Sequence, residues 1–254
     1  HACSDAGHPT TLGAADASLA MAQPELDQLR SIVQDSLGKH MYDNAIFFAD
    51  KLVTMSNGAD DDVFLLCQAY VFTKQHRRAL HVLRKTGLAG SSARFCYLTA
   101  KCLAECQDWD EALDCLNQRA LELATQAQEL AGCDAGHVGL HSAMLLLKGS
   151  VYESLENGPL AARHYCDALR SEPLNYEAMN RLVCNHMLDA SERAALLMEL
   201  EARLGARHLG WIKLYYQCKL DPEVGSKLAA LHEAATAAEA PPPFGGVRIP
   251  GGAA

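Results

Sequence analysis

One alanine recurs along the chain at a nearly constant interval, each time near the start of a segment with helical apolar spacing. The four copies are Ala45, Ala79, Ala112 and Ala161, separated by 34, 33 and 49 residues, and the last step equals 34 plus a 15-residue insertion. Each alanine follows another segment with apolar residues at i, i+3, i+4 and i+7 spacing, and these first segments cover 24–37, 61–74, 92–106 and 141–155. A helix pair repeated at this period buries its apolar faces only by stacking on its neighbours.

The fourth unit carries the fullest motif. Large apolar, small, aromatic and rigid residues occupy the positions that the 34-residue tetratricopeptide pattern gives to such residues. These are Leu145, Gly149, Tyr152, Ala161, Tyr165, Ala168 and Pro173. Lys148 departs from the pattern, which has Leu there, and "ENGP" predicts a turn in which Gly158 takes a positive φ and Pro159 begins the second helix. The sequence therefore predicts an all-α protein, a tetratricopeptide-repeat α-solenoid that forms a right-handed superhelix of antiparallel helix pairs.

Composition and local pattern divide the chain into three parts. Aromatic residues make up only 6% of it, and Ala and Leu dominate, which favours helices. Residues 1–23 are polar without a period and are predicted to be disordered, whereas 24–220 form about five helix pairs with an insertion near 121–139, which suits a surface loop or a lengthened helix followed by a loop. A fifth, poorer pair has Ser191 as its expected N-cap. Residues 221–254 are predicted to be a loose helix and a Pro/Gly-rich disordered tail, as in a truncated or divergent version of a longer array.

Charge and cysteine usage exclude several classes of protein. The formal net charge of −9, from 22 basic and 31 acidic residues, predicts no basic stripe for nucleic acid, and no apolar run could span a membrane. The first residues lack the features of a signal peptide, so we expect a soluble, intracellular protein. The ten cysteines form no C-x-x-C pair. We interpret Cys96, Cys102, Cys106 and Cys115 as small core residues of a protein from a reducing compartment.

Several sequence segments that depart from the repeat consensus resemble the N-terminal third of the subunit 6 family of the anaphase-promoting complex, the cell-cycle ubiquitin ligase. They include "YDNAIFFADKLVTMS" (42–56), "CQAYVFTKQHRRALHVLRK" (67–85) and "EAMNRLVCNHMLDASER" (177–193), and the likeness covers roughly 24–220. The resemblance implies a non-catalytic scaffold of the ligase, active in mitosis in nucleus and cytoplasm, that binds other subunits and homodimerises through its N-terminal repeats. The family is much longer than this chain, so its binding of a small accessory subunit through later repeats is not carried over.

The expected dimer interface lies in the first repeats, which carry more apolar residues than one helix face can bury. The candidate residues are Ile46, Phe47, Phe48, Leu52, Phe64, Tyr70 and Phe72. The alternative is that all of these side chains pack inside the array. On the dimer hypothesis, the first three repeats interlock about a two-fold axis and bury on the order of 2,000 Å² or more.

The alternative function is a stand-alone tetratricopeptide adaptor that binds peptide segments of partner proteins. Such receptors clamp a carboxylate with basic residues on their first helices, and here those positions hold Arg30, Gln34, Phe64, Gln68 and Leu98. Only Arg30 is charged, and we interpret it and Arg94 as solvated surface residues. Basic residues facing the groove would favour the adaptor.

No catalytic or cofactor site is predicted. His137 and His141 have the spacing of two metal ligands on a helix, but "HVGLH" lacks the Glu of H-E-x-x-H and contains Gly139. His186 beside Cys184 could indicate a thiol nucleophile, but we interpret His186 as a packing residue in place of the repeat's tyrosine. The chain also lacks the phosphate-binding loop and nucleophile-elbow motifs. We therefore expect a protein that is not an enzyme and needs no cofactor or metal.

Overall fold

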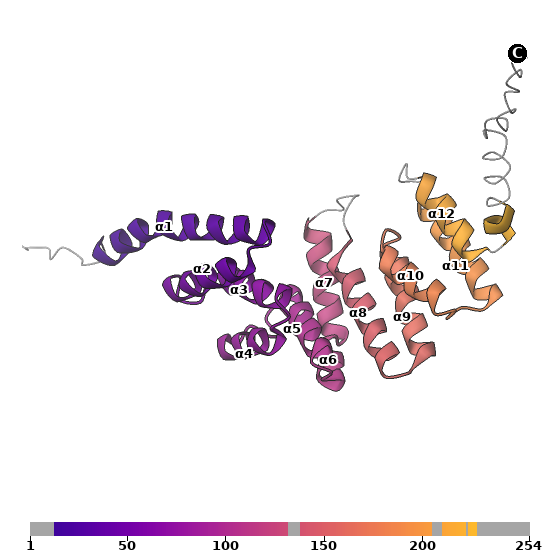
Figure 1. The fold of residues 1–254 in the computed structure, drawn as a ribbon, viewed down its shortest axis with the longest axis horizontal. Coiled ribbons are helices and arrows are strands. Elements are labelled where there is room, and N and C mark those ends of the chain that lie inside the picture. The colour runs from indigo at the N-terminus through magenta and orange to yellow at the C-terminus, as the bar shows by residue number, and fades with distance from the viewer. Residues whose placement is uncertain (1–12, 132–137, 205–209, 222, 228–254) are drawn as a thin grey trace, which may run out of the picture. The chain divides into compact units, whose positions relative to one another are not determined.

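The computed structural model describes residues 13–131, 138–204, 210–221 and 223–227, and every regular element in these ranges is a helix (Figure 1). The helices are α1 (Gly13–Gly38), α2 (Tyr42–Met55), α3 (Asp60–Phe72), α4 (His76–Thr86), α5 (Ala93–Glu105), α6 (Trp109–Cys115), α7 (Gln118–Ala131), α8 (Leu140–Ser154), α9 (Gly158–Ser171), α10 (Tyr176–Cys184), α11 (Ala190–Leu204) and α12 (Gly210–Leu220). The all-α tetratricopeptide-type fold is thus confirmed.

The helices form pairs in chain order, joined by short turns. The pairs are α1/α2, α3/α4, α5/α6, α8/α9 and α10/α11. By its contacts the chain divides into two units, 1–164 and 165–254. In the first unit each of the helices α1 to α5 packs on the next, and the first helices of successive pairs also touch, α1 with α3 and α3 with α5. In the second unit α11 packs on α12.

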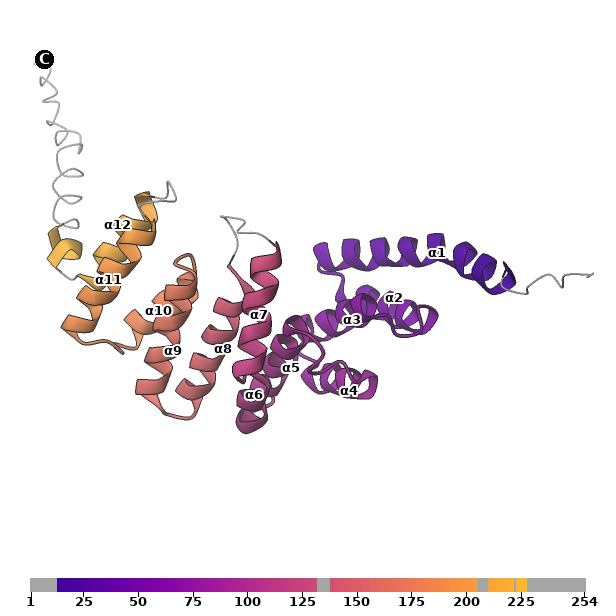
Figure 2. The same cartoon turned by 180° about the vertical axis from the view of Figure 1, so that it is seen from behind.

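One boundary differs from the sequence-based expectation, and a second follows one of its two alternatives. Helix α1 begins at Gly13, inside the segment 1–23 that was expected to be disordered, while residues 1–12 lie outside the described residues. The insertion near 121–139 is largely helical, because α7 runs to Ala131 and packs between α5 and α8 (Figure 2). Ala and Leu in "RALELATQAQELA" favour a helix there over a loop. Most of the expected C-terminal tail lies outside the described ranges.

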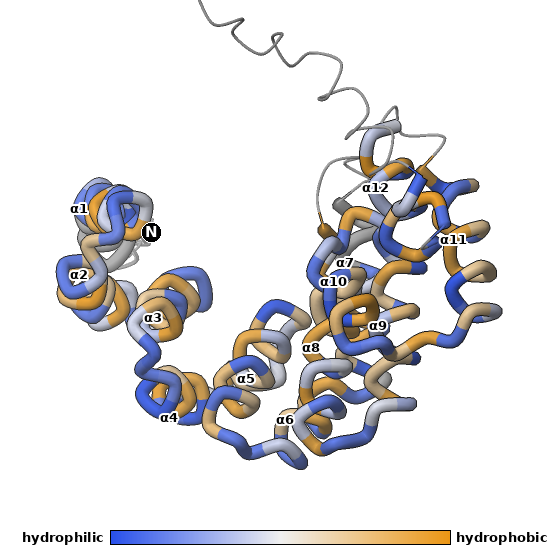
Figure 3. Tube along the Cα trace, turned by 45° about the vertical axis from the view of Figure 1, so that its right-hand side comes forward, coloured by the Kyte–Doolittle hydropathy of each residue, from blue (hydrophilic) through white to orange (hydrophobic). Residues whose placement is uncertain are grey.

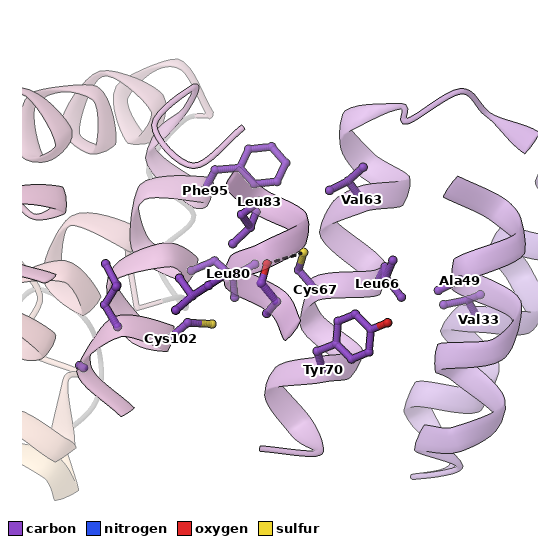
Figure 4. Packing of buried hydrophobic residues seen from close by; sticks show 14 of the residues in the cluster. Val33, Ala49, Val63, Leu66, Cys67, Tyr70, Leu80, Leu83, Phe95 and Cys102 are labelled. Atoms are coloured by element: carbon purple, nitrogen blue, oxygen red, sulfur yellow. Dashed lines mark hydrogen bonds between the residues drawn. The ribbon is translucent and has the colours of Figure 1, made fainter. Parts of the chain in front are cut away.

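The core of the first unit runs through the stacked pairs. Ala45, Ala79, Ala112 and Ala161 have no exposed surface, as close approach of two helices requires. Figure 4 shows Cys67 between Leu66 and Leu80, with its Sγ 3.9 Å from the carbonyl oxygen of Ala79. The small residues therefore lie where the second helix of a pair meets the first.

A left-handed residue recurs in the turn inside each pair. His40, Lys74, Gln107, Glu156 and His186 have φ values of 59°, 58°, 66°, 59° and 49°. The first four precede the recurring alanines by five residues each, so the turn repeats with the helices. The predicted positive φ at Gly158 is wrong, because Glu156 takes that conformation and Gly158 is the first residue of α9. His186 is likewise an exposed turn residue rather than a packing residue.

Polar side chains cap several later helices. Asn157 and Asn175 accept hydrogen bonds from the backbone N–H groups of Leu160 and Ala178. At α11 the cap is Asp189 rather than the expected Ser191: its Oδ1 accepts from the N–H of Glu192 at 2.7 Å, and Glu192 Oε2 accepts from the N–H of Asp189 at 2.9 Å. This reciprocal capping box lowers the pKa of Asp189.

Candidate interaction surfaces

An ion pair joins the first helices of the first two repeats. Arg30 on α1 donates from Nε to Asp62 Oδ1 at 2.7 Å and from Nη2 to Asp62 Oδ2 at 2.9 Å, and it also donates to Asp27. The Asp62 side chain is fully buried, and the Arg30 side chain is 29% exposed. The hydrogen bond to Asp62 is the main reason that the Arg30 pKa is raised. Arg30 is therefore a structural ion-pair partner, and its interpretation as a solvated residue was wrong.

A second pair continues this arrangement between α3 and α5. Arg94 Nη2 lies 2.6 Å from Asp61 Oδ1, and its guanidinium lies over the rings of Phe64 and Phe95 at 5.2 and 5.1 Å from their centroids. Phe64 and Phe95 pack edge to face at 5.7 Å. Since both arginines on these first helices already pair with an aspartate, neither offers the free cation of a carboxylate clamp.

The candidate dimer residues separate into exposed and buried groups. Phe47 is 58% and Phe72 is 49% exposed, and Phe72 stacks on Tyr42 with 5.6 Å between ring centroids. Ile46, Phe48 and Phe64 are half-buried. Leu52 and Tyr70 are buried inside the protomer, so the prediction that a partner contacts them was wrong. Periodicity alone could not make this division, because a solenoid helix buries more than one face.

The motif residues of the fourth unit lie mainly in the interior. Gly149, Tyr165, Ala168 and Pro173 are buried, and Tyr152 is half-buried, with its ring stacked on that of His164 at 5.3 Å. In the second unit the hydroxyl of Tyr216 donates to the carbonyl oxygen of Pro173 at 2.8 Å. That hydrogen bond satisfies a buried polar group beside the proline.

A basic stripe covers the outer face of α4 and the turn before it. Its residues are Lys74, Arg77, Arg78, His81, Arg84 and Lys85, all exposed. Ala79, Leu80 and Leu83 occupy the buried face, so α4 is sharply amphipathic (Figure 3). The net charge of −9 averages over the whole chain and did not reveal this local stripe, whereas the expectation that nucleic acid is not a partner stays a prediction. A twelve-residue window without Asp or Glu, "KQHRRALHVLRK", was the signal that would have found it.

The cysteines in the described ranges are free thiols. Burial raises the pKa of Cys67 and Cys102 to about 12 and that of Cys166 to about 11, so these thiols stay protonated. Cys96 is buried too, whereas Cys106 and Cys115 are only half-buried. His137 lies outside the described residues, and within them no cluster of three or more His, Cys, Asp or Glu side chains could hold a metal. No described helix combines the length and apolarity needed to cross a membrane.

Comparisons with known proteins point to subunits of the anaphase-promoting complex, although the family model and the relatives carry different subunit numbers. A family model described as anaphase-promoting complex, cyclosome, subunit 3 matches residues 38–119. Anaphase-promoting complex subunit 6 of Arabidopsis thaliana is 32% identical over 207 residues, covering 78% of this chain and 37% of the relative. Cell division cycle protein 16 homolog of Homo sapiens is 31% identical over 186 residues, covering 69% of this chain and 30% of the relative.

Solved structures support the same relationship. The crystal structure of the APC/C hetero-tetramer Cut9-Hcn1 contains a chain that is 31% identical with a TM-score of 0.66, and the match covers 80% of this chain and 38% of that one. The crystal structure of MamA, at 20% identity and a TM-score of 0.50, shows likeness of fold alone, covering 78% of this chain and 97% of that one. The chain spans about a third of the length of the curated relatives it matches. The resemblance indicated by the sequence is thus confirmed, and the chain belongs to the family of anaphase-promoting complex subunit 6.

Proposed function

We propose that this chain acts as a non-catalytic scaffold segment of the anaphase-promoting complex ubiquitin ligase, working through protein–protein contacts in cell division. The observation that carries the proposal is the match to the chain in the Cut9-Hcn1 assembly, at 31% identity and a TM-score of 0.66 over 80% of this chain. The relatives that match over most of this chain are named as subunits of that complex or as cell division cycle proteins. A helical array offers a large surface for such contacts and requires no reaction chemistry.

The proposal includes self-association through the first repeats. Phe47 and Phe72 leave large apolar surfaces exposed on α2 and α3, and Met41 and Met55, at the two ends of α2, are also exposed. Exposed apolar side chains on neighbouring elements are typical of surfaces that another chain covers. A two-fold dimer would cover each copy with the same residues of the other.

The stand-alone adaptor receives less support from the first-helix face. Arg30 and Arg94 would have to bind a peptide carboxylate, yet Asp62 and Asp61 already occupy them. Of the expected clamp positions only Arg30 is basic, and the exposed cations Arg77 and Lys85 lie on α4, the second helix of its pair.

Affinity purification from dividing cells tests the scaffold proposal. The tagged chain should recover other subunits of the ligase, and a variant with Phe47→Glu should still recover them if heteromeric contacts use other surfaces. Recovery of no ligase subunit under conditions that recover a tagged full-length relative would contradict the proposal.

A further inference from the structure

Positive charge is concentrated on one short helix of an otherwise acidic chain. Residues 74–85 contain five Lys and Arg residues and no Asp or Glu, whereas the chain has 22 basic and 31 acidic residues. Arg77, His81 and Arg84 follow i, i+4 and i+7 spacing, and Arg78 and Lys85 flank them on the same outer face of α4. Arg84 and Lys85 suit the last turn of α4, whereas Arg77 and Arg78 lie in its first turn, where positive charge opposes the helix dipole, and like charges so close repel one another.

Only part of this charge is neutralised within the chain. Arg84 donates to Glu111 Oε2 of α6 at 2.5 Å, and Arg78 lies 4.5 Å from the ring centroid of Tyr70 and donates to the Gln75 side chain. Lys74, Arg77 and Lys85 have no ion-pair partner in the part of the chain that the structure describes. The Arg84–Glu111 pair shows that this face accepts a carboxylate, and the three remaining cations are available to others.

A pocket of about 510 Å³ opens at the start of the stripe. It is lined by Lys74, Gln75, His76, Arg77 and Arg78, and by Glu105, Cys106 and Gln107 from the next repeat. The Nδ1 atom of His76 is buried there without a hydrogen-bond partner, and α4 begins with no side-chain cap. An anionic oxygen in this pocket would lie beside the His76 ring and meet the uncapped backbone N–H groups at the positive end of the α4 dipole.

The neighbouring acidic groups limit which anion fits. Glu105 lines the pocket itself, so a singly charged carboxylate is repelled less than a doubly charged phosphate. Asp108, Asp110 and Asp114 are exposed on and before α6, the helix whose Glu111 pairs with Arg84 of the stripe. The stripe is about 16 Å long, from 11 residues at 1.5 Å each. A nucleic-acid strand would extend past it toward these carboxylates, whereas a short peptide segment need not.

We propose that the basic stripe of α4 and the pocket before it form a docking site for a short Asp/Glu-rich segment of a partner polypeptide. One carboxylate occupies the pocket beside His76, and following carboxylates pair with the free cations along α4. Charge complementarity carries this assignment, and charge-assisted pairs of this kind also steer association. The site consists of basic residues on and before α4 rather than the exposed aromatic residues of α2 and α3, and it goes beyond the proposed scaffold role.

Binding of a synthetic peptide tests the site on the full chain. The probe is a fluorescein-labelled peptide of ten alternating Glu and Ser residues, followed by fluorescence anisotropy at low salt. Reversing two free cations with Lys74→Glu/Arg77→Glu should weaken binding at least tenfold. The matched control, Lys39→Glu/Lys51→Glu, changes the net charge equally on exposed residues outside the stripe and should stay within twofold of wild type.

The variants are chosen so that folding is preserved. Glu156 has a φ of 59° at the turn position equivalent to Lys74, so glutamate is tolerated there, and an acidic residue suits the first turn of α4. Neutral Lys74→Gln/Arg77→Gln should bind with intermediate affinity, and circular dichroism should be unchanged throughout. Equal weakening by the stripe and control variants, or tighter binding of a ten-nucleotide single strand than of the peptide, would overturn the proposal. Because the probe is synthetic, failure here leaves the scaffold proposal intact.

Discussion

Arg30 of α1 and Asp62 of α3 form a bidentate ion pair that connects the first helices of two successive repeats, with Asp62 fully buried. The two side chains differ in solvent exposure, since 29% of the Arg30 side chain is exposed. Removing Asp62 leaves a cation that can turn toward water, whereas removing Arg30 leaves a carboxylate that cannot.

We therefore predict an asymmetric effect on stability. Arg30→Met should lower the free energy of unfolding by about 3–5 kcal/mol, because it strands a buried charge. Asp62→Ala should cost less, about 1–3 kcal/mol. Asp61→Ala, which removes an exposed partner of Arg94, serves as the control and should stay within about 0.5 kcal/mol. Urea unfolding of the three variants measures this, and a loss at Asp62 equal to or larger than the loss at Arg30 would contradict it.

The left-handed turn residue gives a second prediction. Glu156 is exposed with a φ of 59°, a conformation that glycine adopts without strain and β-branched residues adopt badly. Glu156→Gly should leave stability unchanged or raise it by up to about 1 kcal/mol, and Glu156→Val should lower it by about 1–2 kcal/mol. The control Arg163→Gly, on the exposed face of α9, should cost about 1 kcal/mol. Thermal unfolding that ranks valine above glycine at residue 156 would refute the turn assignment.

Self-association should depend on an exposed aromatic residue. Phe47 is 58% exposed, so Phe47→Glu should leave helicity intact and shift a dimer to monomer at micromolar concentration in light scattering. Trp211→Glu, at an even more exposed residue of α12, is the control and should leave the mass unchanged. A wild-type chain that is already monomeric at that concentration would rule out the dimer.

Alkaline pH should destabilise the fold through its buried thiols. Burial raises the pKa of Cys67 and Cys102 from 9.0 to about 12. Between these values the unfolded chain releases thiol protons that the folded chain retains, so the free energy of unfolding falls as pH rises from about 9 to about 12. The double variant Cys67→Ala/Cys102→Ala should be less stable at neutral pH but show a shallower decline. Identical slopes of stability against pH in the two proteins would contradict this assignment.

Local pattern determined much of the architecture. The recurring alanines and the i, i+3, i+4, i+7 segments predicted the five helix pairs and their order, because each pair buries the same small and apolar positions against its neighbour. The residues in the same segments that depart from the repeat consensus indicated the family that the comparisons confirmed. These features are local or repeat at one period, so a single sequence reveals them.

Turn conformations and helix caps were harder to predict from the sequence, because several neighbouring residues have side chains suited to the same role. Gly158 and Ser191 have suitable chemistry, but Glu156 takes the left-handed conformation and Asp189 forms the cap. The backbone at these points is set by how the second helix packs back on the first. Packing therefore imposes the strained conformation on whichever residue occupies that position.

Only the tertiary structure decided which side chains face outward and which find partners. The sequence assigned Leu52, Tyr70 and Phe47 to one surface, yet stacking of the pairs buries the first two and exposes the third. It left Arg30 as a solvated charge, although the packing of α1 on α3 places it against Asp62. Burial and charge pairing depend on how each helix is rotated about its axis against its two neighbours. The apolar period shows which face of a helix is buried, but it does not show which residues of that face remain exposed or which charges meet.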